Sequence, residues 1–202
     1  MKKIALFLYL LFSLSAVALG QKIFKDDRYG FSMQEPENWM TGDKKMITEN
    51  LGKLKLDEDE LAKLIKSSNG SYLLTSFYKY NPKTHAGVIP TIQVNVRTNP
   101  TKTFEQFSAV MNNSMGSLQS VFNDFSFVKK LEATELNGAK ALYFVGTYTL
   151  TIKGNESTKV RVSNYSIPYG NYFFQVSFIN ELAVDEDVKL FDALAKTIKI
   201  GR

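Results

Sequence analysis

The sequence contains no cysteine, a single histidine and a single tryptophan among its 202 residues. Without cysteine no disulfide can form and no lipid can be attached at an N-terminal cysteine, so a packed core has to hold the fold. One histidine cannot build a zinc site, which needs three or four ligands that are mostly Cys and His. Neither Gly-x-x-x-x-Gly-Lys nor Gly-x-Gly-x-x-Gly occurs, which excludes the two common phosphate-binding loops.

The chain also lacks a concentrated block of one charge. Its formal net charge is +5, and without Lys2 and Lys3 it falls to +3. The basic residues are spread along the chain, whereas a nucleic-acid-binding protein needs them gathered on one face. With 44% hydrophobic and 13% aromatic residues the chain is typical of a globular protein.

The first twenty residues have the layout of a secretory signal peptide. Lys2 and Lys3 precede an apolar run over residues 4–12, and the small residues Ala18 and Gly20 follow. The apolar run is shorter than the ~20 residues that span a bilayer, which favours cleavage before Gln21 over an uncleaved anchor. We therefore predict a signal peptide over 1–20, one domain over 21–202, and a secreted or periplasmic protein with no transmembrane segment after cleavage.

Alternation of period two predicts strands, and apolar stripes at spacings of three or four predict helices. A capping box at Thr103 and Gln106 starts the clearest helix, in which Gly116 is a weak point. Asn137-Gly138 is a strong hairpin signal within a four-stranded meander. The expected strands cover 22–24, 29–34, 71–80, 91–97 and four segments between 124 and 178, and the expected helices cover 57–68, 103–122 and a segment from Asp185.

Few side chains stand out for chemistry. His85 lies in a loop bounded by prolines, without a nucleophile motif near it. The acidic clusters at 57–60 and 185–187 each begin an expected helix, where carboxylates stabilise the positive end of the helix dipole. The sequence thus assigns no catalytic, metal-binding or cofactor-binding residue, and it predicts no cofactor.

Several tyrosines lie near strand ends, where a phenol can be half exposed and reach a partner. The alternative is local packing with the hydroxyl group in water. Four Asn-x-Ser/Thr sequons also occur, at positions 69, 112, 155 and 164. The residues that we predict as partner contacts are Tyr80, Lys83, His85, Tyr169 and Tyr172.

Four motifs in order resemble PsbP-like proteins. They are "DDRYGFSMQEPENWM", "TFEQFSAVMNNSM", "ELNGAKALYFVGTYT" and "YSIPYGNYFFQVSF" followed by "FDALAKTIKI". The resemblance implies an α/β/α sandwich of the α+β class, related to DcrB-type bacterial envelope proteins, with an antiparallel sheet of about six strands and three helices. It marks Tyr29, Phe31, Pro36 and Trp39 as structural positions and transfers no functional residue.

The namesake family member is an extrinsic photosystem II subunit that helps to retain calcium and chloride, and its relatives act mostly by binding and by assisting assembly. The present chain has no long N-terminal extension before Tyr29 and no match for the family's metal-linked histidines. Three hypotheses follow. The first is a non-enzymatic accessory protein that contacts a protein or cell-envelope component. The second is a carrier of an apolar ligand or lipid between sheet and helices, and the third is a hydrolase that uses carboxylates or His85.

Overall fold

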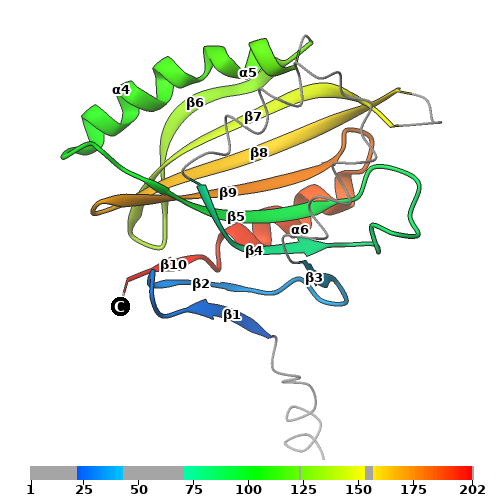
Figure 1. The fold of residues 1–202 in the computed structure, drawn as a ribbon, viewed down its shortest axis with the longest axis horizontal. Helices are drawn as coiled ribbons and strands as arrows, with labels where there is room; N and C mark the ends of the chain where they lie inside the picture. The colour runs from blue at the N-terminus through cyan, green and yellow to red at the C-terminus, as the bar shows by residue number, and fades with distance from the viewer. Residues whose placement is uncertain (1–21, 43–70, 123, 153–156, 202) are drawn as a thin grey trace, which may run out of the picture.

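The structure of the chain is a computed structural model that describes residues 22–42, 71–122, 124–152 and 157–201. A seven-stranded antiparallel sheet has the strand order β3-β4-β5-β9-β8-β7-β6, and a three-stranded antiparallel sheet has the order β1-β2-β10. Figure 1 shows helices α4 and α5 across one face of the large sheet, which we call the α4 face. Helix α6 and the small sheet cover the opposite face, which we call the α6 face.

The described residues contain ten strands and three helical segments. The strands are β1 (Ile23–Asp26), β2 (Phe31–Gln34), β3 (Met40–Gly42), β4 (Ser71–Tyr78), β5 (Thr91–Thr98), β6 (Ser126–Leu136), β7 (Ala139–Thr151), β8 (Ser157–Tyr169), β9 (Tyr172–Glu181) and β10 (Lys199–Ile200). The helices are α4 (Phe104–Ser114), α5 (Gly116–Val121) and α6 (Asp185–Ala195).

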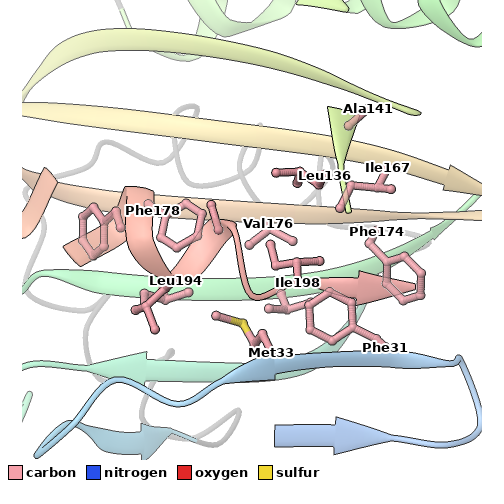
Figure 2. Close-up of a cluster of buried hydrophobic side chains, with 14 of the residues drawn as sticks. Phe31, Met33, Leu136, Ala141, Ile167, Phe174, Val176, Phe178, Leu194 and Ile198 are labelled. Atoms are coloured by element: carbon pink, nitrogen blue, oxygen red, sulfur yellow. The ribbon is translucent and has the colours of Figure 1, made fainter. Parts of the chain in front are cut away.

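The largest apolar cluster lies between the α6 face of the large sheet, helix α6 and strand β2, as Figure 2 shows. Phe31 and Met33 alternate with polar residues in β2 and are 1% and 0% exposed. The ring of Phe31 packs 5.1 Å from that of Phe174 in β9. The indole of Trp39 lies 6.0 Å from the ring of Phe191 in α6. The "YGFSMQEPENWM" stretch therefore belongs to the core and its edge, as the sequence predicted.

The long helix expected over 103–122 is interrupted. Helix α4 begins after Thr103, whose side chain accepts a hydrogen bond from the N–H of Gln106, as the capping box predicted. It ends at Ser114, and α5 begins at Gly116. Glycine loses more backbone freedom than other residues when it enters a helix, so the break at this point is physically reasonable. The apolar stripe still packs on the α4 face, where Phe107 contacts Phe173.

The meander predicted after Asp124 is confirmed, because β6, β7, β8 and β9 pair in sequence order. Asn137 and Gly138 both have positive φ angles, 48° and 83°, which a two-residue turn of this type requires. Strand β8 continues through Pro168 and Tyr169, which pair with Phe173 and Tyr172, so the turn consists of residues 170–171.

One prediction of side-chain orientation was wrong. Strict alternation over 71–80 placed Tyr72 and Phe77 on opposite faces, but both lie on the α6 face, opposite Val96 and Ile92. The cause is a register shift between Leu73 and Thr75, which inserts an extra residue into β4 and reverses the alternation beyond it.

The expected strand count was also wrong, because the central sheet has seven strands and a separate three-stranded sheet accompanies it. The short strands β3 and β10 were not predicted, and β1 and β2 pair outside the central sheet. The described helices lie on both faces of the large sheet, as expected of an α/β/α sandwich. The third expected helix, 57–68, lies outside the described residues.

Two glycines provide a test of packing in this fold. A side-chain carbon at Gly146 in β7 would overlap the ring of Phe125, whereas one at Gly116 meets nothing within 4 Å. We expect Gly146→Ala to lower the free energy of unfolding by about 1–3 kcal/mol, because the core has to shift to accept the methyl group. Gly116→Ala should raise it by about 0.5–1 kcal/mol, because alanine restricts the unfolded chain and favours the helix. Urea unfolding measures both, and equal effects of the same sign would contradict this packing.

Candidate functional site

The five predicted contact residues lie in two groups at opposite ends of β5. Tyr80, Lys83 and His85 belong to the loop that joins β4 to β5, whose first residue, Thr91, pairs with Tyr78. Tyr169 and Tyr172 flank the β8–β9 turn, and Tyr172 pairs with Thr98 at the other end of β5. At ~3.3 Å per residue the two ends are about 23 Å apart, so the five residues cannot form one small site.

The 81–90 loop is held in one conformation by its own hydrogen bonds. Asn81 accepts at its backbone oxygen from the N–H groups of Thr84 and His85, and its side-chain oxygen accepts from the N–H of Lys83. The N–H of Lys79 donates to the oxygen of Pro90, which closes the loop at its base. A contact surface on this loop is therefore ordered before any partner binds.

The exposed surface of this loop is an aromatic stack. The rings of Tyr80 and His85 are 4.5 Å apart and nearly parallel, with an angle of 21° between them. Tyr80 is 41% exposed. The ammonium nitrogen of Lys79 lies 5.7 Å from the centre of the Tyr80 ring, within the range of a cation–π contact. We call Lys79, Tyr80 and His85 the loop cluster.

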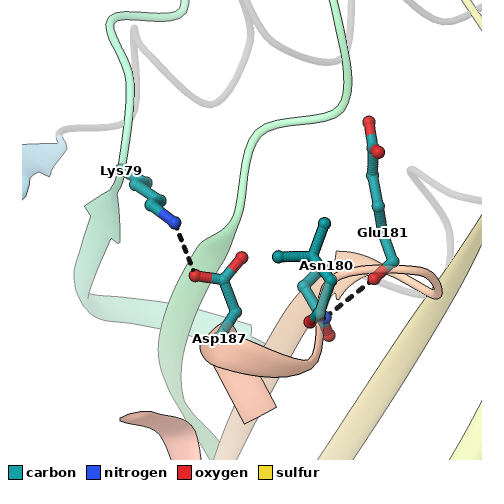
Figure 3. A network of polar contacts seen from close by, with 5 residues as sticks. Lys79, Asn180, Glu181 and Asp187 are labelled. Atoms are coloured by element: carbon teal, nitrogen blue, oxygen red, sulfur yellow. Dashed lines mark hydrogen bonds and ion pairs between the residues drawn. The ribbon is translucent and has the colours of Figure 1, made fainter. Parts of the chain in front are cut away.

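Figure 3 shows an ion pair between Lys79 of the loop cluster and the buried Asp187 in the first turn of α6. Lys79 Nζ donates to Asp187 Oδ1 over 2.8 Å, and Asp187 is only 2% exposed. This hydrogen bond is the largest cause that raises the pKa of Lys79 above its ordinary value. Asn180 fixes the start of α6, because its Nδ2 donates to the backbone oxygens of Glu181 and Val184. The pair thus links the loop to the first turn of α6.

Glu181 is a further ionisable residue near the loop cluster, and it lies beside Gly87. A side-chain carbon at this position would lie 3.2 Å from His85 Nε2 and 3.8 Å from Glu181 Oε1. Both groups therefore lie beside this glycine, where a larger residue would press on the imidazole. Within the described residues, no group of three or more His, Asp or Glu side chains could hold a metal ion.

The other end of β5 carries a tyrosine cluster. Tyr172 donates its hydroxyl to the backbone oxygen of Tyr29 over 2.8 Å, and the two rings meet edge to face at 5.4 Å. Tyr169 packs 5.7 Å from Tyr172. The guanidinium of Arg28 lies 5.5 Å from the Tyr29 ring and 5.8 Å from the Tyr72 ring. Tyr172 therefore has a structural role here, while Arg28 and Tyr72 form the exposed part.

The sequence did not single out Lys79, Asp187 or Arg28. Asp187 appeared only as a member of the acidic start of α6, where it is in fact buried against a lysine that lies 108 positions earlier in the chain. Neither a lysine directly after an apolar strand nor an arginine next to a tyrosine indicates a functional site by itself. Their roles depend on which distant segments meet, and a single sequence does not show this.

A polar group on the α4 face was also not expected. Asn164 Nδ2 donates to Ser177 Oγ over 2.7 Å, and Ser166 Oγ donates to Asn164 Oδ1 over 3.2 Å. Asn164 is 2% exposed and Ser166 is fully buried. These side chains satisfy one another inside the sheet, so the sequon at Asn164 is inaccessible to a glycosylating enzyme in the folded chain.

Two solved structures of other proteins align with most of this chain. Cyanobacterial PsbP (CyanoP) from Synechocystis sp. PCC 6803 aligns over 93% of this chain and 98% of its own, with 14% identity and a TM-score of 0.53. A Bacteroides thetaiotaomicron protein aligns over 91% of this chain and 50% of its own, with 13% identity and a TM-score of 0.50. This chain has a PsbP-like fold.

A third structure is LpqN, a protein involved in cell envelope biogenesis of Mycobacterium tuberculosis, which aligns over 92% of this chain and 87% of its own. Its identity is 14% and its TM-score 0.47. Neither protein-family models nor curated proteins match the chain. Among the described helices none is long and apolar enough to cross a membrane.

The buried ion pair gives a prediction for stability and its pH dependence. Lys79→Met leaves the Asp187 carboxylate buried without its cation, which should cost about 2–3 kcal/mol at neutral pH, less than for a fully buried pair because Lys79 is 28% exposed. Because the pKa of Lys79 is raised, the stability from this pair is complete below the ordinary value of 10.5 and is lost as the pH rises through the raised value. The stability of the Lys79→Met variant should therefore not show this decrease at alkaline pH.

Lys129→Met is the matched control. Lys129 also pairs with a carboxylate, Glu132 at 2.6 Å, but both side chains are about half exposed, and such pairs contribute little. Urea unfolding at neutral pH and above pH 10.5 compares the two variants. Equal losses at both positions would contradict a special role for the Lys79–Asp187 pair.

Proposed function

We propose that this chain is an exported, non-enzymatic accessory protein that acts by contact with a protein of the cell envelope. Residues 1–20 are its signal peptide, and residues 21–202 form a single PsbP-like domain. The loop cluster is the principal contact surface, with Lys83 beside it. The PsbP-like fold supports the accessory role, and the exposed side chains of the described residues support action by contact.

The observation that carries the proposal is the loop cluster itself. Tyr80 is 41% exposed, yet its position is fixed by His85 on one side and by the nearby ammonium group of Lys79. Tyrosine residues that are rigid and partly exposed dominate the binding energy of many interfaces, because little conformational entropy is lost on binding. The ion pair between Lys79 and Asp187 anchors the base of the loop to the first turn of α6.

The same contacts give less support to the two alternatives. A hydrolase would need His85 beside a nucleophile, but the imidazole is stacked on Tyr80 and the neighbouring ionisable group is Glu181. A carrier would need open apolar space between sheet and helices. On the α4 face the rings of Phe107 and Phe173 instead pack 5.3 Å apart, and those of Phe122 and Tyr148 stack at 4.0 Å.

A photo-crosslinking amino acid in place of Lys83 tests the contact surface. In the envelope fraction of the source cells it should give one dominant crosslinked protein. Adding Tyr80→Ala should reduce the yield of this product about tenfold, because truncation of an interface anchor costs at least ~1–2 kcal/mol of binding. Gel analysis of the crosslinked product measures the yield.

Val128→Ala provides the control, because Val128 is 64% exposed in β6, at the far edge of the large sheet, and belongs to neither proposed surface. It should leave the crosslinking at position 83 unchanged. If both alanine variants reduce the yield equally, or if the crosslinker captures many proteins in proportion to their abundance, the loop cluster is not a specific contact surface.

Export has a separate test. If residues 1–20 are removed by a signal peptidase, the mature protein should begin at Gln21, because Ala18 and Gly20 are the small residues that such an enzyme reads. N-terminal sequencing of the protein from its source cells, after separation of cytoplasm and envelope, gives the answer. An intact Met1 in the membrane fraction would instead show an uncleaved anchor.

A further inference from the structure

The three-stranded sheet has one packed face and one open face. Its inner face carries Phe24, Phe31 and Met33, which pack against the large sheet. On its outer face Lys25 and Lys199 both lie opposite Ser32, one on each side of it. Ile23 lies on the same outer face, one alternate position before Lys25. Side chains of a strand alternate between faces, so this set points away from the core.

This outer face is basic in a chain of low net charge. Residues 22–34 and 199–201 contain four basic side chains, Lys22, Lys25, Arg28 and Lys199, and two acidic ones, Asp26 and Asp27. Asp26 is partly buried and accepts the N–H of Tyr29, and Asp27 forms an exposed ion pair with Lys25 over 2.7 Å. The region thus carries two of the three net positive charges that remain after residue 20.

Apolar and aromatic side chains accompany the charges. Ile23 is 64% exposed and Tyr72 is 41% exposed. Arg28, in the turn between β1 and β2, lies over the ring of Tyr29 and over that of Tyr72 in β4. Basic side chains bind lipid phosphates, tyrosine rings favour the headgroup level, and an exposed aliphatic side chain enters the acyl boundary. The composition therefore suits the surface of a bilayer better than water alone.

The position of this face in the chain supports the same partner. Strand β1 begins at Ile23, and only residues 13–22 separate it from the apolar run over residues 4–12. Ten extended residues span at most ~35 Å. Until residues 1–20 are cleaved, Ile23 is therefore held within this distance of the membrane that contains the run.

We propose that the outer face of the three-stranded sheet, with Ile23, Lys25 and Lys199, binds the surface of an anionic phospholipid membrane together with Arg28 in the β1–β2 turn and Tyr72 beside it in β4. We call this set the basic face. It shares no residue with the loop cluster, and it does not depend on a protein partner.

Co-sedimentation with vesicles tests this proposal. The chain from Gln21 on, which contains every described residue, is mixed with vesicles of phosphatidylcholine alone or of phosphatidylcholine with phosphatidylglycerol. It should sediment with the anionic vesicles only, and high salt should release it. The double variant Lys25→Gln, Lys199→Gln should bind at least about tenfold more weakly, since each cation near an anionic surface contributes to binding. Ile23→Ser should weaken binding severalfold.

The strand β6 offers matched controls, because Val128 is 64% exposed, as Ile23 is, and Lys130 is exposed beside it. Val128→Ser and Lys130→Gln should leave vesicle binding unchanged, and circular dichroism confirms that all variants are folded. Equal binding to both kinds of vesicle, equal loss in the β6 controls, or no binding to anionic vesicles would overturn the proposal. The last result would indicate an acidic protein as the partner of this face.

Discussion

Burial of strand β2 is the constraint on which the arrangement of both chain ends depends. Phe31 and Met33 are almost fully buried, and each such side chain stabilises the fold by about 1.5–3 kcal/mol. On one edge β2 pairs with β1, and on the other it pairs with β10 at the C-terminus. The N–H of Gly201 also donates to the oxygen of Gly30. One pair of apolar side chains therefore brings two segments, about 170 positions apart, to the α6 face of the large sheet.

The same constraint determines where the molecule can make contacts. Strand β2 and helix α6 cover one face of the large sheet, and α4 and α5 cover the other. The side chains in the middle of the sheet are therefore largely buried on both faces. Ionisable side chains gather instead at the two ends of β5 and on the outer face of the small sheet. Lys79 and Asp187 meet only because α6 is held on the α6 face beside the end of β4. The candidate surfaces are thus consequences of the core rather than additions to it.

Local patterns in the sequence predicted much of this fold. The alternation in β5 and β9, the capping box at Thr103 and the turn at Asn137-Gly138 each depend on neighbouring residues, and each was confirmed. Features that depend on distant pairing were not predicted. Strand β10 has two residues and no signal of its own, and the register shift in β4 only appears against β5. The candidate site follows the same division, because the loop with Tyr80 and His85 was expected, whereas Asp187 and Arg28 were not.

The two proposed surfaces share no residue. The loop cluster belongs to the loop between β4 and β5, whereas the basic face belongs to the small sheet, its β1–β2 turn and the start of β4. Lipid on one surface therefore uses none of the residues that would meet a protein on the other. The chemistry of the two surfaces agrees with this division. Arg28 and Lys199 suit phosphate groups, while Tyr80, His85 and Glu181 offer both donors and acceptors, as a protein interface requires. A protein held in this way would act where membrane and envelope proteins meet.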